Sequence, residues 1–151
     1  MIKLARKYSF DKYGEGRSRI ITLKQSFHGR TVTTLKATGQ DKFHQYFFPF
    51  TEGFDYVTPG NIEEMEEKLD DSVCAVMLEL IQGEEACCLW IRNCERNRKI
   101  CRKKDILLLI DEVQTVSAAP ARCSAMSSTE FLQTWSARQR DWEEAFPSAQ
   151  S

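Results

Sequence analysis

Carboxylates follow two continuously apolar runs in this sequence. Val73–Leu78 ends at Glu79, and Ile106–Ile110 ends at Asp111 and Glu112. Short apolar runs of this kind are typical of strands that are covered on both faces in a parallel sheet. Ligands of such sheets bind beyond the carboxyl ends of the strands. The acidic residues are therefore placed where charge-assisted hydrogen bonds could hold a ligand, although Asp111 could instead cap the next helix.

The segments ahead of these runs predict helices that alternate with strands. Apolar residues at helical spacing predict a helix over Ile2–Tyr13, and β-branched residues predict a strand over Arg19–Leu23. Residues 26–31 then form a loop, and a short helix is expected from Thr31 towards Ala37. This alternation indicates an α/β fold with a mostly parallel sheet and flanking helices.

Residues 43–54 and the segment after them differ in character. The first is an aromatic stretch with Pro49, and we expect an irregular loop with one buried side. Asn61 is a favourable N-cap with Glu64 as its capping-box partner. The helix that follows should bury Met65 and lead into the first of the two apolar runs.

Three motifs occur together along the chain. They are residues 26–31 (Ser-Phe-His-Gly-Arg-Thr), 79–84 (Glu-Leu-Ile-Gln-Gly-Glu) and 111–114 (Asp-Glu-Val-Gln). In this order they resemble the class III pyridoxal-phosphate-dependent aminotransferases of fold type I, and among these the acetylornithine aminotransferases. The resemblance covers about residues 1–84 and 99–115, and it implies part of the large α/β domain of that fold.

The resemblance implies a set of cofactor-binding residues for pyridoxal 5'-phosphate. Asp111 would hold the proton on the pyridine nitrogen, which makes the ring a better electron sink. Val113 would pack against the ring, and Phe27 would stack on its other face, the alternative for Phe27 being a place in the core. Gln114 would bond the ring hydroxyl, and Glu112 would help to position the backbone.

Two further residues are implied to contact the substrates, which in this family are amino acids and 2-oxo acids. Arg30 would grip a carboxylate with its planar fork, unless it is a solvated surface arginine. Glu84 would pair with an arginine further along the chain until a dicarboxylate displaces it. His28 is interpreted as a structural loop residue. The resemblance also implies a cytoplasmic homodimer that acts on N-acetylornithine and 2-oxoglutarate in arginine biosynthesis. Ornithine, succinyldiaminopimelate and 4-aminobutyrate stay open as alternative amino donors.

No catalytic residue is assigned, because the lysine that carries the family's Schiff base is expected after Gln114. The last lysine of the sequence is Lys104, and the family's Gly-Ser/Thr phosphate turn would precede Met1. We therefore expect the chain as given to bind the cofactor poorly and to be inactive.

Residues 86–98 depart from the family pattern in a way that a slipped reading frame explains. For residues 84–93 the codons GAG-GAG-GCG-TGC-TGC-CTT-TGG-ATA-AGG-AAT are allowed. When the last base of each codon is joined to the next two bases, they spell Gly-Gly-Val-Leu-Pro-Leu-Asp-Lys-Glu, the family's continuation after Glu84. We expect the frame to return by about Lys99, so that residues 1–115 form a partial large domain.

Residues 116–151 are interpreted as a second frame-slipped segment. The segment is rich in Ala, Ser, Arg and Gln, and we expect a disordered tail without a strand. The same regrouping of bases over Arg138–Ala149 can spell Ala-Lys-Gly-Leu-Gly-Gly-Gly-Leu-Pro-Ile-Gly, which resembles the family's lysine loop. The missing lysine codon would then lie across Gln139 and Arg140.

Composition excludes several other classes of function. Lys and Arg number 21 against 22 Asp and Glu, so the sequence lacks the basic character of a nucleic-acid binder. No apolar run reaches the roughly 18 residues that span a membrane.

Two alternatives stay open: a non-catalytic α/β binding module whose tail has a partner, and a zinc-binding domain. The zinc ligands would be Cys87, Cys88, Cys94 and Cys101, although their spacing is not that of paired CxxC motifs.

Overall fold

Residues 1–79, 89–111 and 134–137 are described by a computed structural model of the chain, with the backbone alone for 89–95 and 134–137. Within these ranges five strands form one sheet in the order β2-β1-β3-β4-β5. Every neighbouring pair is parallel, which confirms the predicted α/β fold. The strands are β1 (Arg19–Leu23), β2 (Phe54–Val57), β3 (Val73–Glu79), β4 (Leu107–Asp111) and β5 (Thr134–Ala137).

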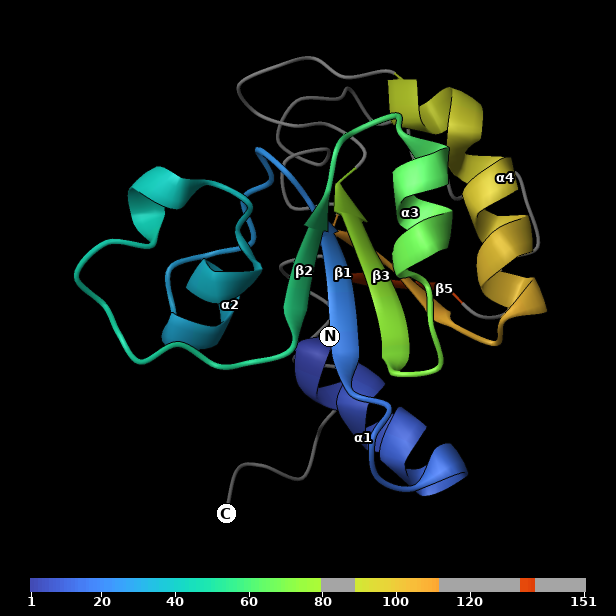
Figure 1. The fold of residues 1–151 in the computed structure, drawn as a ribbon, viewed down its shortest axis with the longest axis horizontal. Coiled ribbons are helices and arrows are strands. Elements are labelled where there is room, and N and C mark those ends of the chain that lie inside the picture. The colour runs from blue at the N-terminus through green and yellow to red at the C-terminus, as the bar shows by residue number, and fades with distance from the viewer. Residues whose placement is uncertain (80–88, 112–133, 138–151) are drawn as a thin grey trace.

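Helices cover both faces of the sheet, which gives three layers (Figure 1). Helices α3 and α4 lie against one face, where Met65 and Cys101 join the buried side chains of the strands. Helix α1 and the end of α2 cover the other face, through Ile2, Ala5 and Ala37. The helices are α1 (Ile2–Tyr13), α2 (Val32–Ala37), α3 (Ile62–Lys68) and α4 (Leu89–Lys103), with a 3-10 turn, η1, at Asp41–Phe43.

Successive residues of β1 point into different layers, as the period of two in a strand requires. Ile21 and Leu23 pack on the side of α3, whereas Ile20 packs on the side of α1. All three side chains are fully buried, and each contributes about 1.5–3 kcal/mol relative to an exposed position. The central strands read as continuous apolar runs because helices cover them on both faces.

Two strands differ from what the sequence predicts. β2 begins at the end of the stretch expected to be an irregular loop, and only the first and last of its four residues are buried. β5 lies within residues 116–151, so the expectation of a tail without a strand is wrong. β5 pairs with β4 through the backbone, and backbone pairing of so short a segment leaves no pattern in the sequence. The rest of that tail lies outside the described residues.

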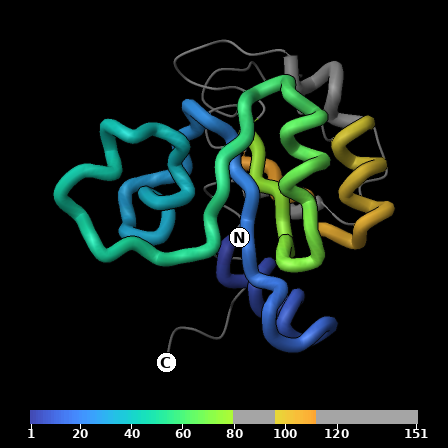
Figure 2. The backbone as a smooth tube through the Cα atoms, viewed as in Figure 1, coloured from blue at the N-terminus to red at the C-terminus, as the bar shows by residue number. Residues whose placement is uncertain are grey.

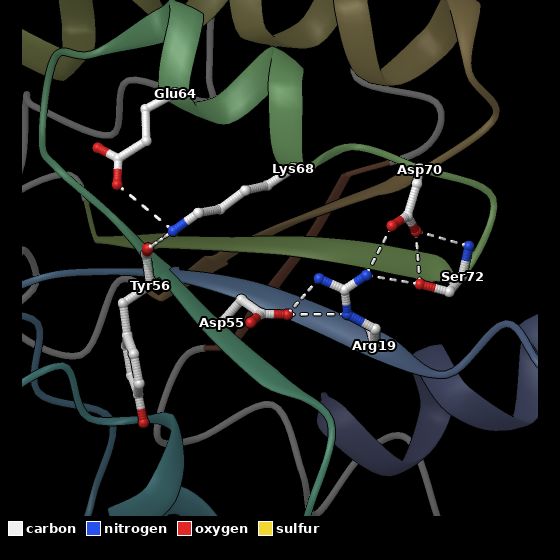
Figure 3. A network of polar contacts seen from close by, with 7 residues as sticks. All are labelled: Arg19, Asp55, Tyr56, Glu64, Lys68, Asp70 and Ser72. Atoms are coloured by element: carbon white, nitrogen blue, oxygen red, sulfur yellow. Dashed lines mark hydrogen bonds and ion pairs between the residues drawn. The ribbon is translucent and has the colours of Figure 1, made fainter.

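Helix α3 begins after Asn61, as predicted, but Glu64 has a different partner. The Asn61 side chain accepts the Glu64 N–H at 3.0 Å. The Asn61 N–H already donates to the Thr58 carbonyl at 3.1 Å, so the Glu64 carboxylate accepts the Thr58 N–H instead, at 2.8 Å. This bond is the main reason why the pKa of Glu64 falls to about 2. Glu64 also pairs with Lys68 at 3.4 Å (Figure 3).

Arg19 ties three segments together at the amino end of the sheet (Figure 3). Its guanidinium donates to Asp55 Oδ2 at 2.8 and 2.5 Å and to Asp70 Oδ2 at 2.7 Å. A further bond reaches Ser72 Oγ at 2.8 Å. The starts of β1, β2 and β3 are thereby fixed relative to one another, at the end of the sheet opposite Glu79.

The chain between α2 and β2 leaves the sheet as a wide loop (Figure 2). Its aromatic segment is exposed, with 88% of Tyr46, 56% of Phe47 and 74% of Phe48 accessible to solvent. Phe43 and Phe50 are half-buried. The irregular loop is confirmed, but its inner side is only half-buried, because the one buried residue of the stretch is Phe54 at the start of β2.

Candidate active site

The carboxyl ends of β3 and β4 place two acidic side chains next to each other. Glu79 is the last residue of β3, Asp111 is the last residue of β4, and the two are paired in register. Glu79 is only 4% exposed, and the Asp111 side chain is 11% exposed. Two carboxyl groups are thus buried side by side at the edge of the sheet where ligands of parallel sheets bind.

His28 holds the Asp111 carboxylate. Its Nδ1 lies 2.9 Å from Asp111 Oδ2, and its side chain is fully buried. The His28 backbone N–H donates to Thr38 Oγ1 at 3.0 Å, which fixes the loop to the end of α2. His28 Nε2 is buried and has no hydrogen-bond partner among the described residues. Besides the structural role expected from the sequence, His28 therefore orients the predicted ligand-binding carboxylate.

Residues 26–28 are fixed by the segment that follows α2. Ser26 Oγ accepts the N–H of Gly39 at 3.1 Å, and the Ser26 carbonyl accepts a bond from Gln40 Nε2 at 3.1 Å. Gly39 is required because a Cβ there would come within 2.0 Å of the Leu23 carbonyl oxygen. The close approach holds the loop directly above the end of β1.

Phe27 and Arg30 are presented together by this loop. The Phe27 N–H donates to Glu79 Oε2 at 3.0 Å, and the Phe27 ring meets Phe43 edge-on at a centroid distance of 5.9 Å. The Arg30 guanidinium carbon lies 5.9 Å from the centre of the Phe27 ring, and Arg30 is exposed. The loop thus brings an aromatic ring and an accessible guanidinium to the edge where the two carboxyl groups lie.

Burial and a neighbouring charge shift the pKa of one carboxyl group of this pair, Glu79. The pKa of Glu79 is raised to about 7, mainly by burial and to a smaller extent by the charge of Asp111, against the opposing effects of His28 and the Phe27 N–H. Burial also lowers the pKa of the Met1 α-amino group, although attraction by Asp111 raises it. Two carboxyl groups beside one imidazole make this a place that favours a cationic ligand group.

The structure brings three of the predicted site residues together, namely Phe27, Arg30 and Asp111. The predicted residues that lie outside the described part of the chain are Glu84, Glu112, Val113 and Gln114. Sequence reasoning placed Glu79 at this edge of the sheet, because Glu79 ends a buried strand as Asp111 does, but gave it no specific contact. The contact of His28 with Asp111 had no signal, since 83 residues separate the two.

Metal binding and membrane crossing find no support in the part of the chain that the structure describes. No group of three or more His, Cys, Asp or Glu residues there could hold a metal ion. Of the cysteines in the zinc alternative, Cys101 is buried in the core, and the side chains of the other three lie outside the description. No described helix is long and apolar enough to cross a membrane.

Residues 1–129 match the family model described as aminotransferase class-III. The chain belongs to the class III aminotransferases. It is 50% identical over 116 residues to the acetylornithine aminotransferase of Haemophilus ducreyi. It is 52% identical over 118 residues to that of Caldanaerobacter subterraneus subsp. tengcongensis. Each match covers 76% of this chain but only 30% and 29% of these relatives, so the chain spans less than a third of their length.

Solved aminotransferase structures share the fold. The ornithine aminotransferase of Toxoplasma gondii, whose structure has pyridoxal phosphate at partial occupancy in its active site, is 30% identical with a TM-score of 0.70. The match covers 76% of this chain and 28% of that one. An (S)-enantioselective omega-transaminase from Thermomicrobium roseum is 25% identical with a TM-score of 0.65, covering 74% and 30%. The chain therefore has part of the fold of pyridoxal-phosphate-dependent aminotransferases.

Pyridoxal 5'-phosphate is the cofactor that this family implies, and the described residues fit it. A protonated pyridine nitrogen is a cation, and the buried pair Glu79 and Asp111 favours one. The orientation of Asp111 is fixed in advance by His28 at 2.9 Å. An aromatic ring for stacking is available at Phe27, which the bond to Glu79 holds beside the same strand end.

Proposed function

We propose that the chain is part of an acetylornithine aminotransferase, which moves an amino group between N-acetylornithine and 2-oxoglutarate. The support is the identity of about one half to relatives of that name. The proposal includes a place in arginine biosynthesis and in the cytoplasm. The amino donor can be identified by measuring the transaminase activity of the whole protein with N-acetylornithine and with ornithine. A preference for ornithine would contradict the proposal.

The observation that carries the proposed cofactor site is the hydrogen bond between buried His28 and Asp111, next in sequence to Phe27. When bound, the cofactor supplies the electron sink of transamination. Asp111 would keep the pyridine nitrogen protonated through a charge-assisted hydrogen bond, and His28 keeps that carboxylate in one orientation. Phe27 would stack on the ring. The other residues proposed to contact the cofactor are Glu112, Val113 and Gln114.

Arg30 and Glu84 are proposed to recognise the substrates. Arg30 is exposed beside the Phe27 ring, so its guanidinium is accessible to a substrate carboxylate. A planar guanidinium binds a carboxylate with two parallel hydrogen bonds. Glu84 would pair with an arginine further along the whole protein when no dicarboxylate is bound.

The cofactor site can be tested with pyridoxamine 5'-phosphate, whose amine does not react with exposed lysines. The chain has two histidines, and the second, His44, bonds the Leu35 carbonyl at 3.0 Å and serves as the internal control. In NMR spectra of histidine-labelled chain, added ligand should shift the ring signals of His28 and leave those of His44 in place.

Substitution of Asp111 provides the second arm of this test. Asp111→Asn should weaken the response of His28 about tenfold or more, because a hydrogen bond to a charged group contributes about 1.5–3 kcal/mol. Asp71→Asn is the matched control, since Asp71 is exposed near the other end of β3. Equal responses of the parent chain and Asp111→Asn would refute the role given to Asp111.

A polypeptide with these 151 residues is proposed to have no transaminase activity. It contains no lysine after Lys104, and α4 places Lys103 and Lys104 at the start of β4 rather than at its carboxyl end. Incubation with pyridoxal phosphate, N-acetylornithine and 2-oxoglutarate should give no glutamate above the background without protein. Stoichiometric turnover would contradict this proposal.

Slipped reading frames over residues 86–98 and 116–151 are also proposed. The support for the first slip is Asn97, which is fully buried while both polar atoms of its amide lack a hydrogen-bond partner among the described residues. Buried amides without partners are rare in natural proteins, and a shifted frame would place one without regard to packing. Sequencing the DNA of codons 84–99 and 115–139 decides the matter, because the shifted bases must spell the family motifs.

A homodimer is proposed for the whole protein. The support in this chain is the aromatic segment Tyr46–Phe48, which is exposed on the wide loop. Contiguous exposed aromatic side chains mark surfaces that a partner covers. Sedimentation of the whole protein should give twice the monomer mass, and replacing Phe48 with serine should shift the population towards the monomer.

A further inference from the structure

Glu79 is a buried charged side chain at the site that the proposed function leaves without a role. It ends β3 in register with Asp111 and is only 4% exposed. Its Oε2 accepts the backbone N–H of Phe27 at 3.0 Å, across 52 residues of sequence. A buried carboxyl group is costly to keep unless it has a purpose in the structure or the chemistry.

We propose that Glu79 is a positioning residue, whose carboxyl group anchors the backbone of Phe27 and thereby sets the Phe27 ring and the His28 imidazole relative to Asp111. The inference deepens the proposed function and rests on it, because Phe27 and Asp111 are the groups proposed to face the cofactor. The inference adds a role for the hydrogen bond between Glu79 and the Phe27 N–H, which fixes the positions of Phe27 and His28 relative to Asp111.

The geometry of the loop gives this anchor its importance. Two successive N–H groups are fixed to two different elements: that of Phe27 to β3, and that of His28 to Thr38 at the end of α2. The two hydrogen bonds restrict the backbone of the same two residues, so both bonds are needed to fix the position of the loop. Without the bond to Glu79, the Phe27 backbone could move away from β3, and the His28 ring would lose its alignment with Asp111.

The charges around Glu79 suit an anchor that works in both protonation states. The groups that face it are His28 from the loop and Asp111 from β4, and the Met1 α-amino group of α1 lies close to Asp111. Burial raises the pKa of Glu79 to about 7. The carbonyl oxygen of a neutral carboxyl group still accepts an N–H, so the anchor survives protonation.

Three variants separate the anchor from the charge. Glu79→Gln keeps an acceptor for the Phe27 N–H but removes the ionisation, and Glu79→Met removes both. Glu64→Met is the matched control, because Glu64 accepts the Thr58 N–H at 2.8 Å in the same way, at the end of β2. The hydrogen-exchange and pH-titration measurements use the chain without added cofactor, so their outcome does not depend on whether the cofactor binds.

Hydrogen exchange of single amides tests the anchor. In Glu79→Met the Phe27 amide should exchange about tenfold faster or more, because its bond is lost, and the contact between the rings of Phe27 and Phe43 should weaken. Glu79→Gln should restore both. Glu64→Met should speed the Thr58 amide and leave Phe27 unchanged. An unchanged Phe27 amide in a folded Glu79→Met chain would overturn the proposal.

A pH titration of the unmodified chain tests the same bond without any substitution. The carboxyl carbon of Glu79 and the amide of Phe27 should titrate with one common midpoint, near pH 7. In Glu79→Gln the Phe27 amide should lose this transition while its chemical shift at low pH stays close to that of the parent chain. A Phe27 amide that does not follow Glu79 would show that the two groups are not bonded, and would also overturn the proposal.

The response of His28 to pyridoxamine 5'-phosphate separates this inference from the proposed function. If Glu79 acts as a positioning residue, Glu79→Met should weaken that response at least several-fold, and Glu79→Gln should restore most of it. An altered Phe27 amide together with a His28 that never responds would support the anchor and refute the cofactor site. A response of His28 that Glu79→Met leaves unchanged would refute the anchor's role in the site.

Discussion

The two ends of the sheet carry the same kinds of charged groups in opposite arrangements. At the amino end, Arg19 bonds Asp55 and Asp70, and the three side chains are 32%, 37% and 56% exposed. Bonds from Ser72, followed by Arg19, hold the pKa of Asp70 below its usual value. At the carboxyl end, Glu79 is buried and Asp111 is nearly so, with 11% of its side chain exposed, and the pKa of Glu79 is raised instead.

The ion pairs of Arg19 stabilise the folded chain, whereas placing Glu79 and Asp111 next to each other destabilises it. Arg19 has carboxylate partners on two sides and partial access to water, so little solvation is lost when the bonds form. Two buried carboxyl groups beside one imidazole repel each other, and the repulsion lowers stability. A pKa raised by burial is common at functional sites, and the raised pKa of Glu79 therefore supports the site proposed at the carboxyl end of this sheet.

The largest expected effect concerns the pH dependence of stability. The folded pKa of Glu79, about 7, is above its ordinary value of 4.5, so the folded chain binds the proton more tightly than the unfolded chain does. Stability from this group is complete below about pH 4.5 and is lost as pH rises towards 7, by about 2–3 kcal/mol. Urea unfolding of the parent chain and Glu79→Gln should show this loss in the parent alone.

A matched control for this prediction lies at the end of β2. The pKa of Glu64 is lowered to about 2, so Glu64 contributes stability above about pH 4.5 that is lost as pH falls towards 2. Glu64→Gln should therefore remove the loss of stability on the acid side and lower the free energy of unfolding evenly above pH 4.5, which leaves the slope between pH 4.5 and 7 unchanged. If the free energy of unfolding changed with pH between 4.5 and 7 to the same extent in Glu79→Gln and the parent chain, the predicted difference between the two ends of the sheet would be wrong.

Breaking the amino end should have the next largest effect. Arg19→Met removes the bonds to Asp55, Asp70 and Ser72 and should lower the free energy of unfolding by about 1–2 kcal/mol, since its partners can be solvated. The response of His28 to pyridoxamine 5'-phosphate should stay within about twofold. Arg102→Met, at an exposed arginine of α4, should change neither quantity.

A smaller gain of stability is expected from a buried polar group outside the site. Asn97 and the His28 ring both have buried atoms without hydrogen-bond partners among the described residues, but only His28 contacts a site residue. Asn97→Leu should raise the free energy of unfolding by about 1 kcal/mol, because no hydrogen bond is lost with the amide. Asn61→Leu should lower stability instead, since it removes the N-cap of α3. If Asn97→Leu lowered stability, the proposal that a shifted reading frame placed Asn97 in a buried position by chance would be contradicted.

The smallest effect is predicted for an ion pair that lies away from both ends of the sheet. Lys7 and Asp11 of α1 pair one helical turn apart, with 69% and 57% of their side chains exposed. Asp11→Asn should change the free energy of unfolding by less than about 0.5 kcal/mol. A larger loss of stability in Asp11→Asn would show that solvent exposure alone does not explain why the charged groups at the two ends of the sheet differ in their effect on stability.

Sequence patterns predicted the elements that are long or buried on both sides. The runs that became β3 and β4 were recognisable, and so was the N-cap Asn61. The four-residue strands β2 and β5 were missed because their pairing is made by backbone groups. The role of Asp111 came from resemblance to a family, and the partner of Glu64 was wrong because the Asn61 N–H was already bonded to Thr58.

The sequence by itself determined the family and the acidic residue that ends each central strand. Local patterns and motifs suffice for this, since each involves residues close together in the chain. Tertiary structure decided that Glu79 bonds Phe27 and that His28 bonds Asp111, over separations of 52 and 83 residues. Strand register and loop position create these contacts, and so the burial that raises the pKa of Glu79 exists only in the assembled sheet.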